Sequence, residues 1–73
     1  MSSSREQIRV VVNGREMEIQ EGTALDGLLE RLTIGTAGVA VELNREIIPR
    51  GSHGTTVLQE GDTVEVIQMV GGG

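Results

Sequence analysis

Apolar and polar residues near the start of the chain follow the two-residue period of a β-strand. Residues 8–12 are rich in β-branched side chains, and in residues 15–20 Met17 and Ile19 alternate with polar neighbours, as in a half-buried strand. Between these segments lie Asn13 and Gly14, the preferred centre of a type I′ turn because both residues tolerate a positive φ. The pattern therefore predicts that the chain opens with a β-hairpin.

A stripe of leucines predicts one amphipathic helix after the hairpin. The spacing i, i+3, i+4, i+7 places one apolar face along the segment, at Leu25, Leu28, Leu29 and Leu32. Thr23 is predicted to be the N-cap, with its hydroxyl accepting from the amide of Asp26. Gly35 lies where the helix would stop, and residues 33–38 are predicted to form a loop.

The second half of the chain reads as short strands separated by turns and loops. Pro49 suits a strand end because it cannot donate to a ladder, and His53 is expected to be an exposed loop histidine with no metal or catalytic role. The predicted segments are strands at 39–43, 46–48 and 63–70, a loop at 50–56, a brief return to the core at 57–58 and a turn at 60–62. This order of elements, ββαβ(β)β, belongs to the α+β class.

A single helix covers only one face of a sheet, so the other face should be open. In the last strand Val64 and Val66 alternate with Ile67 and Met69, and the alternation sends the two pairs to opposite faces. If the valines face the helix, Ile67 and Met69 lie on the open face. With Val11 and Ala40 of like phase on neighbouring strands, they predict an apolar docking patch. The alternative is that they are scattered exposed aliphatic residues, which need no function.

Composition narrows the classes of function. The chain has 73 residues, a net charge of −5, six arginines, no lysine, no cysteine and no aromatic residue. Without cysteine, and with one histidine, neither a disulfide scaffold nor a structural zinc site is expected. An acidic chain without aromatic residues is poorly suited to nucleic acid. No apolar run reaches the roughly 18 residues of a membrane span, and no export signal is recognised, so a cytoplasmic location is expected.

The two ends of the chain differ from its middle. Residues 1–7 are polar and without periodicity, and we expect a disordered lead-in there. Residues 8–70 are predicted to form the folded domain, and residues 71–73 a flexible glycine tail. Three extended residues span about 10 Å, and glycine passes through channels too narrow for other residues. Frayed termini are often glycine-rich, so the tail is either an inert end or a thin stalk for a reactive carboxylate.

These motifs in this order resemble the ThiS family of bacterial sulfur carriers. The resemblance rests on Asn13-Gly14, Glu21-Gly22-Thr23 before the leucine stripe, the strand at 40–44, Ile48-Pro49-Arg50, Glu60-Gly61-Asp62 and the final Gly72-Gly73. It covers residues 8–73. It implies a ubiquitin-like β-grasp fold, with a mixed sheet of four to five strands and one helix packed across one face.

The resemblance also implies a role. Gly73 would carry the carboxylate that a ThiF-like adenylating enzyme activates with ATP and Mg²⁺, while Gly72 and Gly71 pass through the partner's channel. Sulfur from a cysteine desulfurase, relayed as a persulfide, would turn that carboxylate into a thiocarboxylate that serves a ThiG-like thiazole synthase. The chain itself would be a co-substrate rather than an enzyme, with no cofactor or metal of its own. Its acidic strand residues would then either complement a basic surface on the adenylating enzyme or simply form solvated strand faces.

Three other functions stay open at this point. One is another β-grasp sulfur carrier, above all the small subunit of molybdopterin synthase, although those relatives usually run longer and use aromatic core residues. Another is a β-grasp binding module with an inert tail that is never conjugated. The third, an independent enzyme, is the least favoured because no nucleophile–base pair is recognisable in the sequence.

Overall fold

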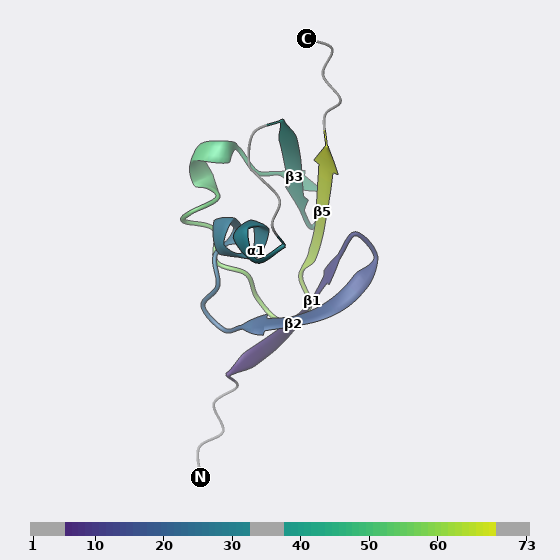
Figure 1. Ribbon diagram of the computed structural model, residues 1–73, viewed down its shortest axis with the longest axis vertical. Coiled ribbons are helices and arrows are strands. Elements are labelled where there is room, and N and C mark those ends of the chain that lie inside the picture. The colour runs from purple at the N-terminus through teal and green to yellow at the C-terminus, as the bar shows by residue number, and fades with distance from the viewer. Residues whose placement is uncertain (1–5, 33–37, 69–73) are drawn as a thin grey trace.

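The computed structural model describes residues 6–32 and 38–68, in which one α-helix lies on one side of a five-stranded sheet (Figure 1). The elements in chain order are β1 (Gln7–Val12), β2 (Arg15–Gln20), α1 (Leu25–Arg31), β3 (Val39–Leu43), β4 (Glu46–Ile47), the 3₁₀ turn η1 (Arg50–Ser52) and β5 (Thr63–Gln68). The predicted α+β class and element order are confirmed.

The last strand lies in the middle of the sheet. The strand order is β2-β1-β5-β3-β4. β5 runs parallel to β1 and antiparallel to β3, while β1–β2 and β3–β4 are antiparallel hairpins. The sheet is therefore mixed, and β5 joins its two hairpins.

Both hairpins turn through two residues of positive φ. Asn13 and Gly14 have φ of 50° and 84°, and Asn44 and Arg45 have φ of 52° and 72°. Two consecutive positive φ values are the mark of a type I′ turn, whose twist matches that of the flanking strands. The first turn was predicted. The second was predicted only as the end of a strand, because Asn-Arg lacks the glycine that usually signals this turn.

The core is entirely aliphatic and lies between α1 and one face of the sheet. Leu25, Leu28 and Leu29 are fully buried, as the leucine stripe predicted, and Leu32 packs partly against them. They meet buried side chains of four sheet strands and the later loop, namely Ile8, Val10, Val12, Ile19, Val41, Leu58 and Val64. The strand alternation therefore assigned Val64 to the correct face.

The start of α1 differs from the prediction. The Thr23 hydroxyl does not cap the helix: it donates to the carbonyl of Gln20, and the N-cap is Ala24, with no side-chain cap. Backbone carbonyls of the later loop take the place of a cap, since Thr56 accepts from the amide of Leu25 and His53 from that of Asp26. The orphan amides of a helix start need partners, and here a distant loop supplies them.

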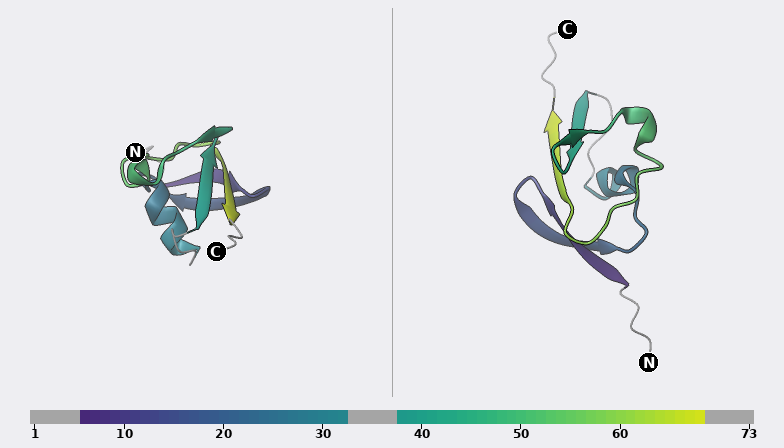
Figure 2. Two further views of the ribbon diagram at one scale, coloured as in Figure 1. Left: turned by 90° about the horizontal axis from the view of Figure 1, so that it is seen from above. Right: turned by 180° about the vertical axis from the view of Figure 1, so that it is seen from behind.

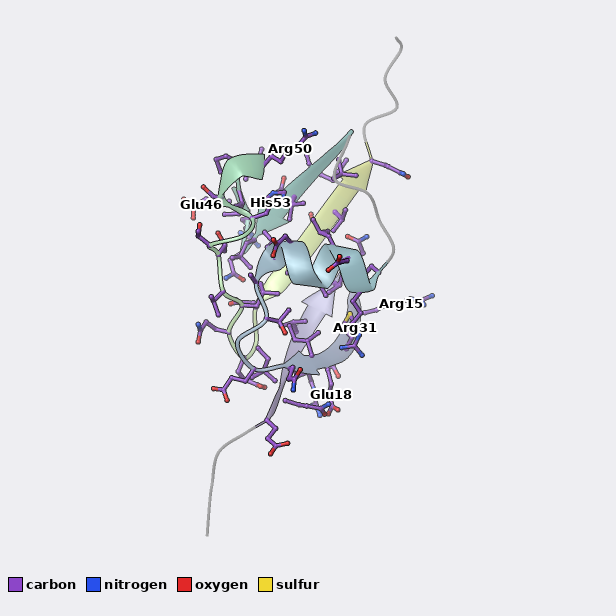
Figure 3. The ribbon with its side chains drawn as sticks, turned by 60° about the vertical axis from the view of Figure 1, so that its left-hand side comes forward. Arg15, Glu18, Arg31, Glu46, Arg50 and His53 are labelled. Carbon is purple, nitrogen blue, oxygen red and sulfur yellow. The ribbon has the colours of Figure 1, made fainter. Side chains whose placement is uncertain are left out.

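His53 is buried, so the prediction of an exposed loop histidine was wrong. The side chain is 4% exposed, and its Nε2 lies 3.1 Å from the carbonyl oxygen of Ile48. The ring is enclosed because the segment after η1 folds back over the helix start, where the His53 carbonyl meets Asp26 (Figure 3). The segment is also closed by two hydrogen bonds of its own. The Ser52 carbonyl accepts from the Thr56 hydroxyl, and the Arg50 carbonyl accepts from the His53 amide.

The amino-terminal end of the domain is described one residue before the predicted limit at residue 8. β1 begins at Gln7, and the carbonyl of Glu6 accepts from the amide of Glu21. The rest of the lead-in predicted at 1–7 lies outside the described residues. So do Met69, Val70 and the glycines 71–73, and the last strand is described as far as Gln68.

Candidate functional site

The sheet has one covered face and one open face. Figure 2 shows α1 and η1 on the same side of the sheet, and no other described element lies on the opposite side. The strand registers decide which residues face outward. We define the open face by Arg9, Val11, Glu16, Glu18, Ala40, Glu42, Ile47, Thr63, Glu65 and Ile67.

Three of the four residues predicted for a docking patch share this face. Ile67 lies directly opposite Ala40 in the β3–β5 ladder, and Val11 lies opposite Thr63 in the β1–β5 ladder. Ile67 is 44% exposed, while Val11 and Ala40 are half-buried. The fourth, Met69, lies outside the described residues.

The sequence reading missed Ile47, which is 65% exposed. It lies opposite Glu42 in the β3–β4 hairpin and therefore projects from the open face. A reading of Asn44 and Arg45 as a two-residue turn would have revealed it, because that turn fixes the register of the hairpin. Ile47 lies at the edge of the sheet in the row of Glu42 and Glu65, next to the row of Ile67 and Ala40.

Acidic residues surround these aliphatic side chains. Four carboxylates lie on the open face, those of Glu16, Glu18, Glu42 and Glu65. The guanidinium of Arg9 is on the same face, 3.9 Å from the carboxylate of Glu18. Glu42 and Glu65 are paired directly across the β3–β5 ladder, and like charges in this position destabilise a sheet. The open face therefore combines exposed aliphatic side chains with an excess of negative charge.

β5 carries the chain toward its carboxyl end and is held from both sides. On one side the antiparallel ladder to β3 runs from Leu43–Val64 to Val39–Gln68. On the other, the amide of Asn13 donates to the carbonyl of Val64, at 2.9 Å. The predicted reactive end, Gly73 with Gly72 and Gly71, lies outside the described residues.

The described residues contain neither a metal-binding cluster nor a membrane-spanning helix. No group of three or more His, Cys, Asp or Glu side chains is placed to hold a metal ion within residues 6–32 and 38–68. In the same ranges, no helix has the length and hydropathy that crossing a membrane requires.

This arrangement defines a class. A mixed sheet whose middle strand comes last, with one helix across one face and a glycine-ended chain after it, is that of small ubiquitin-like β-grasp proteins. The family model of ThiS matches residues 5–73. The chain therefore belongs to the ThiS family, and the family is the one that the sequence predicted.

Individual relatives agree with this assignment. The sulfur carrier protein ThiS of Escherichia coli is 30% identical over 66 residues, which cover 90% of this chain and all of that protein. The crystal structure of the thiamine biosynthesis protein ThiS from Geobacter metallireducens aligns with a TM-score of 0.79 and 33% identity, over 90% of this chain and 100% of that one.

A longer protein is also similar. Thiazole synthase of Magnetococcus marinus is 41% identical over 66 residues. The chain spans 20% of the length of that thiazole synthase, and 90% of this chain takes part in the match. A domain like this one is therefore joined to a thiazole synthase in that organism.

Proposed function

We propose that Gly73 carries the transferred sulfur as a C-terminal thiocarboxylate. Family membership supports this role most strongly. The family model matches the chain as far as residue 73, and the alignment with the E. coli carrier covers the whole of that protein. Gly72 and Gly71 act as the stalk that enters the partner's active site. Without a Cβ, they fit a channel that would exclude other residues.

The proposed chemistry begins by making a poor acyl electrophile reactive. The Gly73 carboxylate attacks the α-phosphorus of ATP, pyrophosphate leaves, and an acyl-adenylate forms on an adenylating enzyme that supplies ATP and Mg²⁺. A persulfide sulfur then attacks the acyl carbon and AMP leaves. A second thiol cleaves the resulting S–S bond, forms a disulfide with the donor and leaves the thiocarboxylate on Gly73.

The thiocarboxylate then donates its sulfur to a thiazole synthase. The fused thiazole synthase of Magnetococcus marinus supports this partner, because one polypeptide there contains both kinds of domain. Covalent attachment of sulfur to the carrier keeps the nucleophile at the acceptor, which makes delivery effectively intramolecular. The resemblance to the family favours a cysteine desulfurase relay as the persulfide donor, with transfer taking place in the cytoplasm.

We further propose that the open face docks on the adenylating enzyme. Ile67 and Ala40 form the described centre of the apolar patch, and Met69 completes it as a prediction. Val11 is on the same face but lies opposite Thr63, four residues along β5 from Ile67, and Ile47 adds an exposed side chain near the edge. Because the four carboxylates of this face outnumber the guanidinium groups of Arg9 and Arg45, the complementary partner surface is apolar with basic groups around it.

The test of the tail is a mass measurement. The chain is incubated with its cognate adenylating enzyme, ATP, Mg²⁺ and a persulfide donor. Exchange of oxygen for sulfur at the activated acyl carbon raises the intact mass by about 16 Da. One tryptophan added after Gly73 should abolish the shift, whereas one added before Met1 is the matched control and should leave it intact. An unshifted mass of the unmodified chain with an active enzyme would favour a binding module with an inert tail.

The docking face is tested by Ile67→Asp. A buried charge in an apolar contact is strongly unfavourable, so the KM of the carrier in adenylation should rise by about tenfold or more. Val57→Asp is the matched control, since Val57 is similarly exposed, at 46%, but lies outside the open face. Equal KM values for Ile67→Asp and the unmodified chain would remove the proposed patch.

A further inference from the structure

Two asparagines in left-handed conformation hold β5 from opposite edges. Asn44 donates its backbone amide to the carbonyl of Thr63, and its Oδ1 accepts from the amide of Thr63 at 3.0 Å. Asn13 donates its backbone amide to Val64, and its Oδ1 accepts from the amide of Val66 at 2.8 Å. Each side-chain amide thus takes the place of a backbone neighbour, one at the start of β5 and the other in its second half.

The Asn13 side chain extends the parallel ladder after β1 has ended. The register of β1 and β5 stops at Val12 and Val64, and the chain then turns away through Gly14. The Asn13 Oδ1 binds the next inward-facing amide of β5, and its Nδ2 approaches the Val66 carbonyl at 3.5 Å. Among the described residues, these are the last hydrogen bonds that the first hairpin gives to β5.

The location of this contact relates it to the reactive end. Val66 stands seven positions before Gly73. From Ile67 onward, β5 is paired with β3 alone, through Ala40 and Val39. A strand held on both edges leaves the sheet in one direction, whereas a strand held on one edge twists and frays more freely. The Asn13 amide therefore marks the last described position at which β5 is held on both edges, two residues before the described end of the strand.

We infer that Asn13 is a positioning residue for activation of the terminal glycine. The inference rests on the proposed function. When the open face has docked, the carboxylate still has to reach the partner's active site. A strand held on both edges as far as Val66 varies less in direction, and this would raise the effective concentration of the carboxylate there. Loss of the Asn13 amide should therefore lower kcat of adenylation, whereas loss of the docking patch should raise KM.

The experiment measures pyrophosphate release by the cognate adenylating enzyme over a range of carrier concentrations. Asn13→Gly keeps the positive φ of the turn and removes the side-chain amide, and we expect kcat to fall about fivefold with KM within about twofold. Asn44→Gly is the matched control: it removes the equivalent amide from the other end of β5, and its kcat should stay at the unmodified value. Asn13→Asp retains an acceptor for the Val66 amide and should recover most of kcat.

The outcomes separate the two proposals. If the unmodified chain is not adenylated, the proposed function fails, whatever the variants do. If it is adenylated, a normal kcat for Asn13→Gly, an equal loss in Asn44→Gly, or an Asn13→Asp variant as slow as Asn13→Gly would overturn the role of Asn13. Hydrogen exchange gives a second readout: the Val66 amide should exchange faster in Asn13→Gly. The amide of buried Leu58, which donates to the Thr23 carbonyl at 3.0 Å, should keep its protection.

Discussion

The two faces of the sheet differ in the interactions that their side chains make. On the covered face, Val10, Val41 and Val64 are fully buried against the leucines of α1. On the open face, aliphatic side chains are left exposed and two glutamates face each other across β3 and β5. The first arrangement stabilises the domain by removing apolar surface from water. The glutamate pair of the second lowers stability, and the docking proposed above would give this arrangement a role.

The largest effect should come from the covered face. Leu28→Ala deletes a fully buried side chain of α1 and should cost about 2–5 kcal/mol, a large part of the margin of so small a domain. Ile67→Ala on the open face is the control and should cost less than about 1 kcal/mol. Urea unfolding followed by circular dichroism measures both, and equal losses would contradict the division between the faces.

A smaller loss is expected where the loop after η1 closes over the helix. His53→Ala removes a buried ring and its contact with the Ile48 carbonyl, and should cost about 1–3 kcal/mol. The nearby exposed Thr55 is the control, and Thr55→Ala should stay within about 0.5 kcal/mol. Thermal unfolding distinguishes them; a His53→Ala domain as stable as the parent would mean that the loop does not support the helix start.

The smallest expected change in the free energy of unfolding is a gain in stability. Glu65→Arg turns the repulsive pair with Glu42 into an attractive one and should stabilise the sheet by roughly 0.2–1 kcal/mol. The same variant should weaken binding to the adenylating enzyme, because it removes negative charge from the docking face.

The control for that variant is Glu30→Arg, which makes the same change of charge on the exposed side of α1. Denaturation and a binding titration at two salt concentrations would measure both properties. If Glu65→Arg and Glu30→Arg change affinity equally, the position of the charge on the open face has no role.

Local pattern was enough to predict most of the fold. The two-residue period of the strands and the leucine spacing of α1 placed Val64, Leu28 and Ile67 on the correct faces, because these periods reflect backbone geometry directly. The Asn13-Gly14 turn was also readable, since its conformation demands those residue types.

The features that were missed depend on contacts between distant segments. Thr23 looked like a cap, but the carbonyls of His53 and Thr56 reached the helix amides instead. The burial of His53 has the same cause, because no local pattern shows that a loop folds back over a helix. Ile47 was hidden by an unusual turn sequence, and the Asn13–Val66 contact joins residues 53 positions apart.

The central position of β5 has a consequence for the folding of the domain during its synthesis. A nascent polypeptide that has not yet acquired residues 63–68 contains two separate hairpins and no strand to bridge them. Synthesis proceeds from the amino end, so both hairpins leave the ribosome before the strand that joins them. The sheet can be completed only after residues 63–68 have followed.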